Sequence, residues 1–103
     1  MTEADFLNQV IDLAHLYKWR VAHFRPGQRS DGTWYTAIQG DAGFTDLVLV
    51  RQPRVIFAEV KSDKGRLSPE QRDWITALDL CPGVETFIWR PRMWDDIVGI
   101  LRC

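Results

Sequence analysis

Two apolar runs joined by a short connection limit the folds open to this chain more than any other feature. The first run, DLVLV, spans residues 46–50, and the second, VIFAEVK, spans residues 55–61, with only RQPR between them. Apolar runs of this length that end at turn-like segments are typical of strands, and so short a connection returns the chain as a β-hairpin. We therefore expect the two runs to become paired neighbouring strands.

Three charged residues stand out on these two runs. Asp46 begins the first run, while Glu59 and Lys61 close the second. Side chains alternate between the faces of a strand, so Glu59 and Lys61 point to the same side and Val60 points back into the core. Two acids and one lysine then converge on one spot, where a divalent cation would offset the cost of placing charge on an apolar strand.

This grouping indicates hydrolytic chemistry. Carboxylate oxygens are the ligands that Mg²⁺ and Mn²⁺ prefer, and such an ion beside a lysine is suited to activating water against a phosphodiester. A structural alternative stays open, in which Asp46 caps a turn and Glu59 and Lys61 form an exposed ion pair. That pair would stabilise the fold by only about 0–1 kcal/mol.

Helix and strand signals continue on both sides of the hairpin. Thr2 and Asp5 have the spacing of a capping box, and Ser68, Pro69 and Gln71 make a second helix start of the S-x-x-Q type. The expected elements are a helix over residues 3–18, a strand over 19–25, a possible short strand over 33–38, strands over 46–50 and 55–61, a helix over 69–80, a strand over 84–89 and a helix over 94–101.

These elements predict an α/β (α+β) fold with a small mixed sheet flanked by helices, in the order α-β-β-β-α-β-α. The chain has 103 residues, which suits one domain over residues 1–103 with a single core. Within the helix over 69–80, we expect Trp74, Ile75 and Leu78 to be buried.

Composition excludes several functional classes. Cys81 and Cys103 are the two cysteines, and neither belongs to a CxxC or Cys/His cluster, so neither a disulfide framework nor a zinc site is indicated. We therefore expect a cytoplasmic protein. No apolar run approaches the roughly 18 residues of a membrane span, so no membrane role is expected. Thirteen Lys/Arg against fourteen Asp/Glu give a net charge of −1, so any DNA-binding surface must be local.

Four segments together carry a family resemblance: GFTDL at 43–47, AEVKS at 58–62, KGRLSPEQ at 64–71 and WRP at 89–91. They resemble the VRR-NUC domain (virus-type replication-repair nuclease) of the PD-(D/E)XK nuclease superfamily. The resemblance implies a PD-(D/E)XK nuclease-like core and a metal-dependent endonuclease that hydrolyses DNA. Stand-alone members, found in bacteriophages and bacteria, are similar to homodimeric enzymes that cut branched DNA such as Holliday junctions. A bacterial cell or a phage-infected host is the location this implies.

The resemblance also implies roles for individual residues. Asp46 and Glu59 match the metal-binding carboxylates, and the backbone carbonyl of Val60 matches a third oxygen ligand, for one or two Mg²⁺ or Mn²⁺ ions. Lys61 matches the catalytic lysine. Gln71 matches a glutamine that faces the active site, although the capping box alone would also explain it.

Two further positions, Glu3 and Thr45, are also compared with the family. Glu3 stands where members have an acid in the first helix that can reach the metal directly or through water, although an acid at a helix N-terminus is favoured without any function. Thr45 departs from the family pattern, which usually has a proline before the aspartate. The proline stiffens that turn without coordinating anything, so the departure affects only the rigidity of the loop.

Local positive charge near these motifs could hold the phosphates of DNA. Candidate DNA contacts are Lys64, Arg66 and Arg72 around the proposed centre, and Arg25, Arg29, Trp34 and Tyr35 in the region before it. Trp34 and Tyr35 would stack on unpaired bases, or would instead belong to the core or to a dimer interface. Two symmetric cuts in a four-way junction need a second active site, so we expect a homodimer, with an interface on Trp89, Met93 and Trp94 or on the first helix.

Two other classes of function compete with the nuclease. One is a non-catalytic nucleic-acid-binding module or a subunit of a replication or repair complex, which a missing acid or lysine would signal. Asp46, Glu59 and Lys61 are all present. The other is a small protein-interaction domain with an incidental E-x-K, which an absence of DNA binding at low salt would favour.

Overall fold

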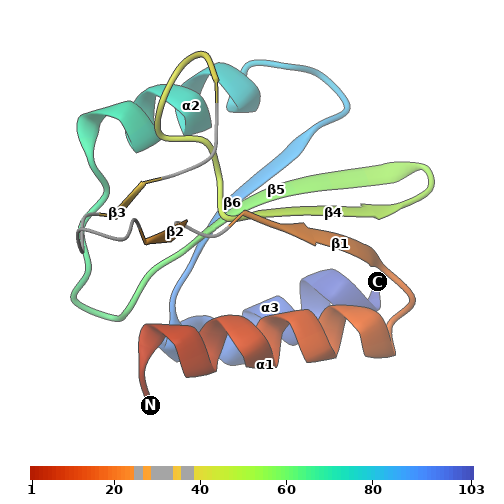
Figure 1. Ribbon diagram of the computed structural model, residues 1–103. Coiled ribbons are helices and arrows are strands. Elements are labelled where there is room, and N and C mark those ends of the chain that lie inside the picture. Colours follow the sequence, from red (N-terminus) through yellow and green to blue (C-terminus); the bar gives the residue numbers. More distant parts are fainter. Residues whose placement is uncertain (25–26, 29–33, 36–38) are drawn as a thin grey trace.

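A four-stranded sheet with the strand order β1-β4-β5-β6 lies between helices in the computed structural model of the chain (Figure 1). The structure describes residues 1–24, 27–28, 34–35 and 39–103. The elements in chain order are α1 (Glu3–Leu16), β1 (Arg20–His23), β2 (Gly27–Gln28), β3 (Trp34–Tyr35), β4 (Leu47–Arg51), β5 (Arg54–Val60), α2 (Pro69–Asp79), β6 (Glu85–Trp89), the 3₁₀ helix η1 (Pro91–Met93) and α3 (Trp94–Arg102). This is the mixed α+β architecture that the sequence predicts.

The predicted hairpin forms the middle of the sheet. β4 and β5 pair in antiparallel fashion, with Leu47 opposite Ala58 and Arg51 opposite Arg54. β1 pairs with the other side of β4 in antiparallel fashion, and β6 pairs with β5 in parallel after the crossover through α2. The strand that carries Glu59 is therefore an interior strand with a neighbour on each side.

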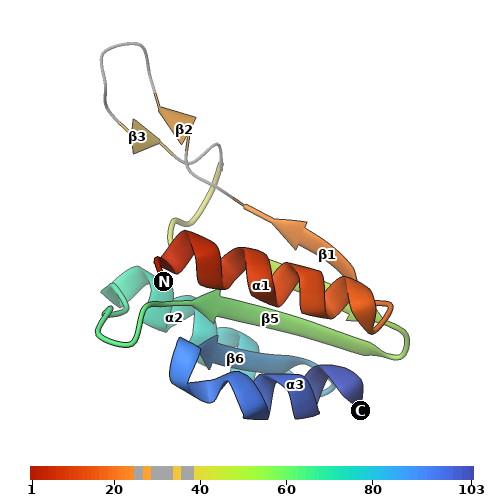
Figure 2. The same cartoon turned by 90° about the horizontal axis from the view of Figure 1, so that it is seen from below.

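The helices divide between the two faces of the sheet. Figures 1 and 2 both show α1 and α3 next to each other on one face and α2 on the opposite face. The core lies between the sheet and the α1/α3 pair, and its buried members are Phe6, Val10, Ala14, Trp19, Leu47, Leu49, Ile56, Ala58, Val60, Trp89, Ile97 and Leu101. Alternation along β5 places Ile56, Ala58 and Val60 in this core and turns Glu59 to the α2 side.

Two expectations about burial are wrong. Trp74, Ile75 and Leu78 of α2 are only half-buried, and α2 contains no fully buried residue, because the main core lies on the other face of the sheet. Trp89 was expected to offer interface surface, but it is buried in the core and its ring stacks on that of Phe87.

Helix ends follow the capping signals closely. Both halves of the capping box are present at Thr2 and again at Ser68. At the end of α1, the Trp19 N–H donates to the Ala14 carbonyl and the Lys18 N–H donates to the His15 carbonyl, both at 3.0 Å. Lys18 has φ +73°, so the helix ends in a left-handed turn two residues earlier than predicted.

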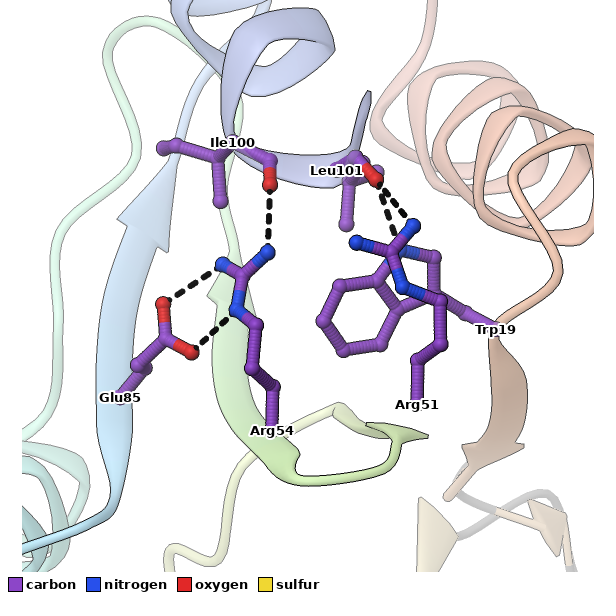
Figure 3. A network of polar contacts seen from close by, with 6 residues as sticks. All are labelled: Trp19, Arg51, Arg54, Glu85, Ile100 and Leu101. Carbon is purple, nitrogen blue, oxygen red and sulfur yellow. Dashed lines mark hydrogen bonds and ion pairs between the residues drawn. The ribbon is translucent and has the colours of Figure 1, made fainter. Parts of the chain in front are cut away.

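Two arginines at the β4–β5 turn bind the last carbonyls of the two neighbouring helices. Arg51 donates to the carbonyl of Tyr17 at 3.0 Å. Figure 3 shows that Arg51 also donates to the carbonyl of Leu101 (2.9 Å) and that Arg54 donates to the carbonyl of Ile100 (3.0 Å). Cations at helix C-termini satisfy carbonyls that have no partner within the helix and complement the helix dipole. The hairpin end is thereby fixed to α1 and α3.

Trp19 and Glu85 complete this network (Figure 3). The centroid of the Trp19 ring lies 4.6 Å from the guanidinium carbon of Arg51 and 4.9 Å from that of Arg54. The Trp19 Nε1–H donates to the Leu101 carbonyl at 2.9 Å. Arg54 also makes a two-pronged ion pair with Glu85 of β6, with both contacts at 2.7 Å. Five elements, α1, α3, β4, β5 and β6, therefore meet at one end of the sheet.

The region between β1 and β4 departs from the prediction. No strand was predicted at Gly27–Gln28, but these residues form β2 and pair with Trp34–Tyr35 in a separate two-stranded sheet. The short strand predicted over 33–38 is described only at 34–35, and its other residues lie outside the described part of the chain, as does residue 25 of the strand predicted over 19–25.

Within the described ranges, we find no helix that combines the length and the apolar character needed to cross a bilayer.

Candidate active site

Asp46 and Glu59 come together because of the register of the hairpin. Leu47 pairs with Ala58, so continuing the ladder by one residue puts Asp46 opposite Glu59. Opposite residues in an antiparallel pair share a face, which brings the two carboxylates side by side. The Asp46 Oδ2 atom accepts a hydrogen bond of 2.9 Å from the Val60 N–H, so the aspartate is held against the end of β5.

Glu59 occupies an unusual position for a carboxylate. It is 1% exposed, and its Oε2 atom is buried without a hydrogen-bond partner among the described residues. Burial raises the pKa of Glu59, the neighbouring Asp46 carboxylate and the charge of Glu3 act in the same direction, and the Lys61 ammonium opposes them, so that the pKa comes to about 9. With only protein atoms around it, the acid pair holds a proton at neutral pH, and a cation beside Oε2 would take that proton's place.

Lys61 leaves the chain on the same side as Glu59. The Lys61 N–H donates to the Trp89 carbonyl at 3.0 Å, which continues the pairing with β6 one step beyond the end of β5. Side-chain alternation therefore extends to Lys61, and its charge acts on the Glu59 carboxyl. The structure thus brings Asp46, Glu59 and Lys61 to one place.

Gln71 satisfies both interpretations of its position with one carboxamide group. Its Oε1 atom accepts from the Ser68 N–H at 2.9 Å, which completes the capping box of α2. Its Nε2 atom donates to the Glu59 Oε1 atom at 3.2 Å. The start of α2 and the acid pair are therefore joined through one side chain.

Gly43 is required by the close approach of its segment to α2. It has φ +92°, and a Cβ atom built there would lie 2.6–2.8 Å from Glu70 and from the Gln71 nitrogen. Only glycine combines that backbone conformation with so small a gap. The segment that ends in Asp46 therefore packs directly on the first turn of α2.

Phe44 anchors the same segment through three aromatic contacts. The centroid of its ring lies 4.9 Å from that of Trp74, 5.4 Å from that of Phe24 and 6.0 Å from that of Phe57, and all three pairs are edge to face. Such pairs stabilise a fold by about 0.5–1.5 kcal/mol beyond the area they bury. No packing role was predicted for Phe44 or Phe24, because their partners come from four different elements or connections.

Thr45 replaces the usual proline without leaving the turn loose. It is fully buried, and its hydroxyl donates to the Leu47 carbonyl at 3.3 Å. A local side-chain bond of this kind limits the backbone, as the ring of proline would.

Arg90, for which no individual role was predicted, fixes the connection that follows Lys61. Arg90 donates through one terminal nitrogen to the carbonyls of Ser62 (2.6 Å) and Gly65 (2.7 Å). Arg92 adds contacts with Asp63. The WRP segment at 89–91 includes Arg90, but its binding to Ser62 and Gly65 could not be predicted because these partners lie more than twenty residues away in the chain.

Other predicted site residues differ in where they lie. Glu3 lines a cavity together with Asp46 and Val60. Lys64 and Arg66, on the connection between β5 and α2, and Arg72, on α2, are exposed, as phosphate contacts require. Arg25 and Arg29 fall outside the described residues, and for Trp34 and Tyr35 only the strand is described.

The side-chain donors for a metal are few. In the described ranges, no group of three or more His, Cys, Asp and Glu residues is arranged to hold a metal ion. The predicted set has two carboxylates, from Asp46 and Glu59, and one backbone oxygen, from Val60, which is compatible with that finding. An orphaned, buried Oε2 on Glu59 next to a second carboxylate fits a hard divalent cation.

Comparison with known families agrees with this geometry. The model of the VRR-NUC domain matches residues 27–88, which include Asp46, Glu59, Lys61 and Gln71. The chain belongs to the VRR-NUC family. This is a nuclease-type family, and the four-stranded mixed sheet flanked by helices is consistent with a PD-(D/E)XK-like core. No curated protein and no solved structure matches the chain.

Proposed function

We propose that this VRR-NUC domain is a Mg²⁺- or Mn²⁺-dependent endonuclease that hydrolyses DNA phosphodiester bonds and prefers branched DNA such as Holliday junctions. One observation carries the proposal: Asp46 lies opposite a buried Glu59 whose Oε2 atom lacks a partner among the described residues, two positions before Lys61. A strand-end ion pair on the surface would explain neither the burial nor the orphaned oxygen.

The carboxylates of Asp46 and Glu59 and the carbonyl of Val60 would hold one or two ions. A bound divalent cation would supply charge stabilisation for the phosphate and a more acidic water molecule. Two hydrogen bonds orient the carboxylates in advance, from the Val60 N–H to Asp46 and from Gln71 to Glu59. Groups fixed before the reaction need no reorganisation in the transition state.

The remaining residues would act on the phosphate and on the attacking water. The Lys61 ammonium would donate a hydrogen bond to that water and offset the negative charge that grows on the phosphate oxygens. Lys64, Arg66 and Arg72 would contact neighbouring phosphates from the exposed surface around the acid pair. Two symmetric cuts in a junction would need two copies of this site, so we propose a homodimer.

Cleavage of a labelled DNA panel tests the proposal. The panel contains a four-way junction, a flap, a splayed arm, a single strand and a plain duplex, each with Mg²⁺ or Mn²⁺. We expect cleavage of the branched members. Asp46→Asn should lower the rate at least about 100-fold, because it keeps an acceptor for the Val60 N–H but removes a charge. Lys61→Ala should do the same while binding of junction DNA in Ca²⁺ persists.

Asp12→Asn is the matched control, because Asp12 is an exposed aspartate of α1 outside the site. Mn²⁺ should raise the melting temperature of the wild type and of this control but not that of Asp46→Asn. Wild-type cleavage by Asp46→Asn or Lys61→Ala would contradict the assignment of the site. DNA binding without any cleavage would favour a non-catalytic module. Light scattering at assay concentrations measures whether the chain is a dimer.

A further inference from the structure

A cavity of about 370 Å³ opens beside the catalytic aspartate, between the first turns of α1 and the end of β1. Its lining includes Ala4, Leu7, Asn8, His23, Phe24 and Asp46. We propose that this cavity receives one unpaired nucleobase next to the scissile phosphate and that Phe24 stacks on it. The inference rests on the proposed function and names the feature of DNA that the site selects.

The size and the lining of the cavity suit a base. Small-ligand sites commonly occupy about 300–1,000 Å³, and a nucleobase with its sugar fits at the lower end of that range. Ala4, Leu7 and Phe24 supply apolar walls and Asn8 supplies a polar group, while Glu3, Asp46 and Val60 line the side that adjoins the proposed metal site. Proteins that hold an extruded base use this combination, with stacking on the faces and hydrogen bonds at the edge.

Phe24 is exposed yet held in place. The residue is 46% exposed, so part of its ring is open to contact with a ligand. Its ring meets Phe44 edge to face at 5.4 Å and 74°, and Phe44 is itself packed against Phe57 and Trp74. An exposed ring that is already oriented loses little entropy when a base stacks on it.

The backbone links this ring directly to the acid pair. The Phe24 N–H donates to the Asp46 carbonyl at 3.0 Å, one step beyond the pairing of β1 with β4. The backbone that carries the ring is therefore tied to the backbone that carries the carboxylate. A phosphate bound at Asp46 carries its nucleotide past the mouth of the cavity, so the base of that nucleotide is the group within reach.

This placement has a consequence for substrate choice. A base inside a duplex is stacked and paired, and only an unpaired or extruded base can enter a cavity. Single-stranded flaps and splayed arms offer such nucleotides without the unpairing cost that plain duplex carries. The cavity would thus favour branched DNA through one nucleotide rather than through the overall shape of the junction.

Fluorescence of 2-aminopurine tests the proposal. The base is placed at each position in turn around the cleavage site of a splayed-arm DNA, and binding is measured with the whole chain in Ca²⁺. We expect one position to change its emission strongly on binding. Phe24→Ala should abolish that change and weaken binding of the splayed arm about 5- to 150-fold, the range for loss of one stacked base, with a much smaller effect on plain duplex.

Two further variants separate stacking from apolar contact and from folding. Phe24→Trp should preserve the emission change, and Phe24→Leu should lose it while keeping apolar bulk against Phe44. Leu16→Ala removes another exposed apolar side chain, at the far end of α1, and is the matched control.

The base site is refuted if no position responds to Phe24→Ala, if Phe24→Leu behaves like the wild type, or if splayed arm and duplex weaken equally. A chain that binds no branched DNA refutes it as well. A chain that binds and stacks the base but never cleaves would overturn the proposed nuclease function alone, since these measurements are made in Ca²⁺.

Discussion

At the scale of single residues, Gln71 joins two structures that the sequence motif treats separately. A capping box accepts either glutamate or glutamine at its third helical position, because only the side-chain oxygen is used. The contact with Glu59 uses the other half of the carboxamide, the Nε2 donor. Glutamate would serve the helix equally well, but it would offer no donor and would add a negative charge beside an acid pair.

Gln71→Glu should therefore separate helix capping from the active site. We expect α2 to keep its stability, while cleavage falls about 10- to 100-fold, the usual effect of losing a group that orients a metal ligand. Gln71→Ala should lose activity and also up to about 1 kcal/mol of stability, since it removes the acceptor for the Ser68 N–H, one half of the capping box. Thermal melts and cleavage rates of the two variants make the comparison. Wild-type cleavage by Gln71→Glu would reduce Gln71 to a capping residue.

The same residues show how far sequence alone reaches at this scale. Asp46, Glu59 and Lys61 could be brought together from strand alternation and the short hairpin, because both rules are local. The bond from Gln71 to Glu59 depends on where α2 crosses β5, which no local pattern encodes. Phe24 was missed for the same reason, since its neighbours Phe44 and Asp46 come from another part of the chain.

At the scale of elements, the segment that leads into β4 and the first turn of α2 fit together closely. Gly43 makes this possible through its positive φ and its missing side chain. Gly83 has a similar φ of +82°, but a Cβ atom there would meet nothing within 4 Å. The two glycines therefore differ in packing and not in backbone conformation.

Comparing Gly43→Ala with Gly83→Ala should isolate the effect of that contact. Both variants carry the cost of a non-glycine residue at positive φ, about 1–2 kcal/mol. Gly43→Ala must also push the segment away from α2, so we expect a further loss of about 1–3 kcal/mol and a strong drop in cleavage. Denaturant unfolding measures both variants. Equal losses of stability in the two variants would show that the segment before β4 can move away from α2 without lowering the free energy of unfolding.

Elements were predictable wherever a local chemical signal marked their ends. The two capping boxes located the starts of α1 and α2, and the four-residue connection located the hairpin. β2 was missed because a two-residue strand depends on its partner and not on its own composition. The half-burial of α2 also escaped prediction, because the spacing of apolar residues does not say which face of the sheet carries the main core.

At the scale of the whole molecule, the arginine network ties the sheet to both helices of the main core. Arg51 and Arg54 reach the ends of α1 and α3, and Glu85 links the same point to β6 (Figure 3). None of these partners is close in sequence to the hairpin turn. The RQPR connection between β4 and β5 is therefore also bound to β6 and to the ends of α1 and α3.

Acid should weaken this network in a defined pH range. The hydrogen bonds from Arg54 hold the pKa of Glu85 below its ordinary value of 4.5. A carboxyl whose pKa is lower in the folded state binds fewer protons there, so its contribution is complete above about pH 4.5 and is lost as the pH falls through the folded-state value. We expect Glu85→Gln to lower the free energy of unfolding by about 1 kcal/mol at pH 7, because the pair is partly exposed.

This difference between Glu85→Gln and the wild type should shrink towards zero as the pH falls below the folded-state pKa of Glu85. Urea unfolding across the pH range measures it. Asp63→Asn is the matched control, because Asp63 and Arg92 form a longer, exposed ion pair at 3.7 Å that should matter little. A pH-independent effect of Glu85→Gln would show that its charge is not what holds the network.

The position of the cavity affects where an affinity tag or a fused domain should be attached. Glu3 and Ala4 line it, so the first residues of the chain lie at its mouth, while Cys103 follows α3 at the opposite end of the helix pair (Figure 2). An affinity tag or fused domain attached ahead of Thr2 would compete with DNA for that entrance. Attachment behind Cys103 leaves the entrance clear.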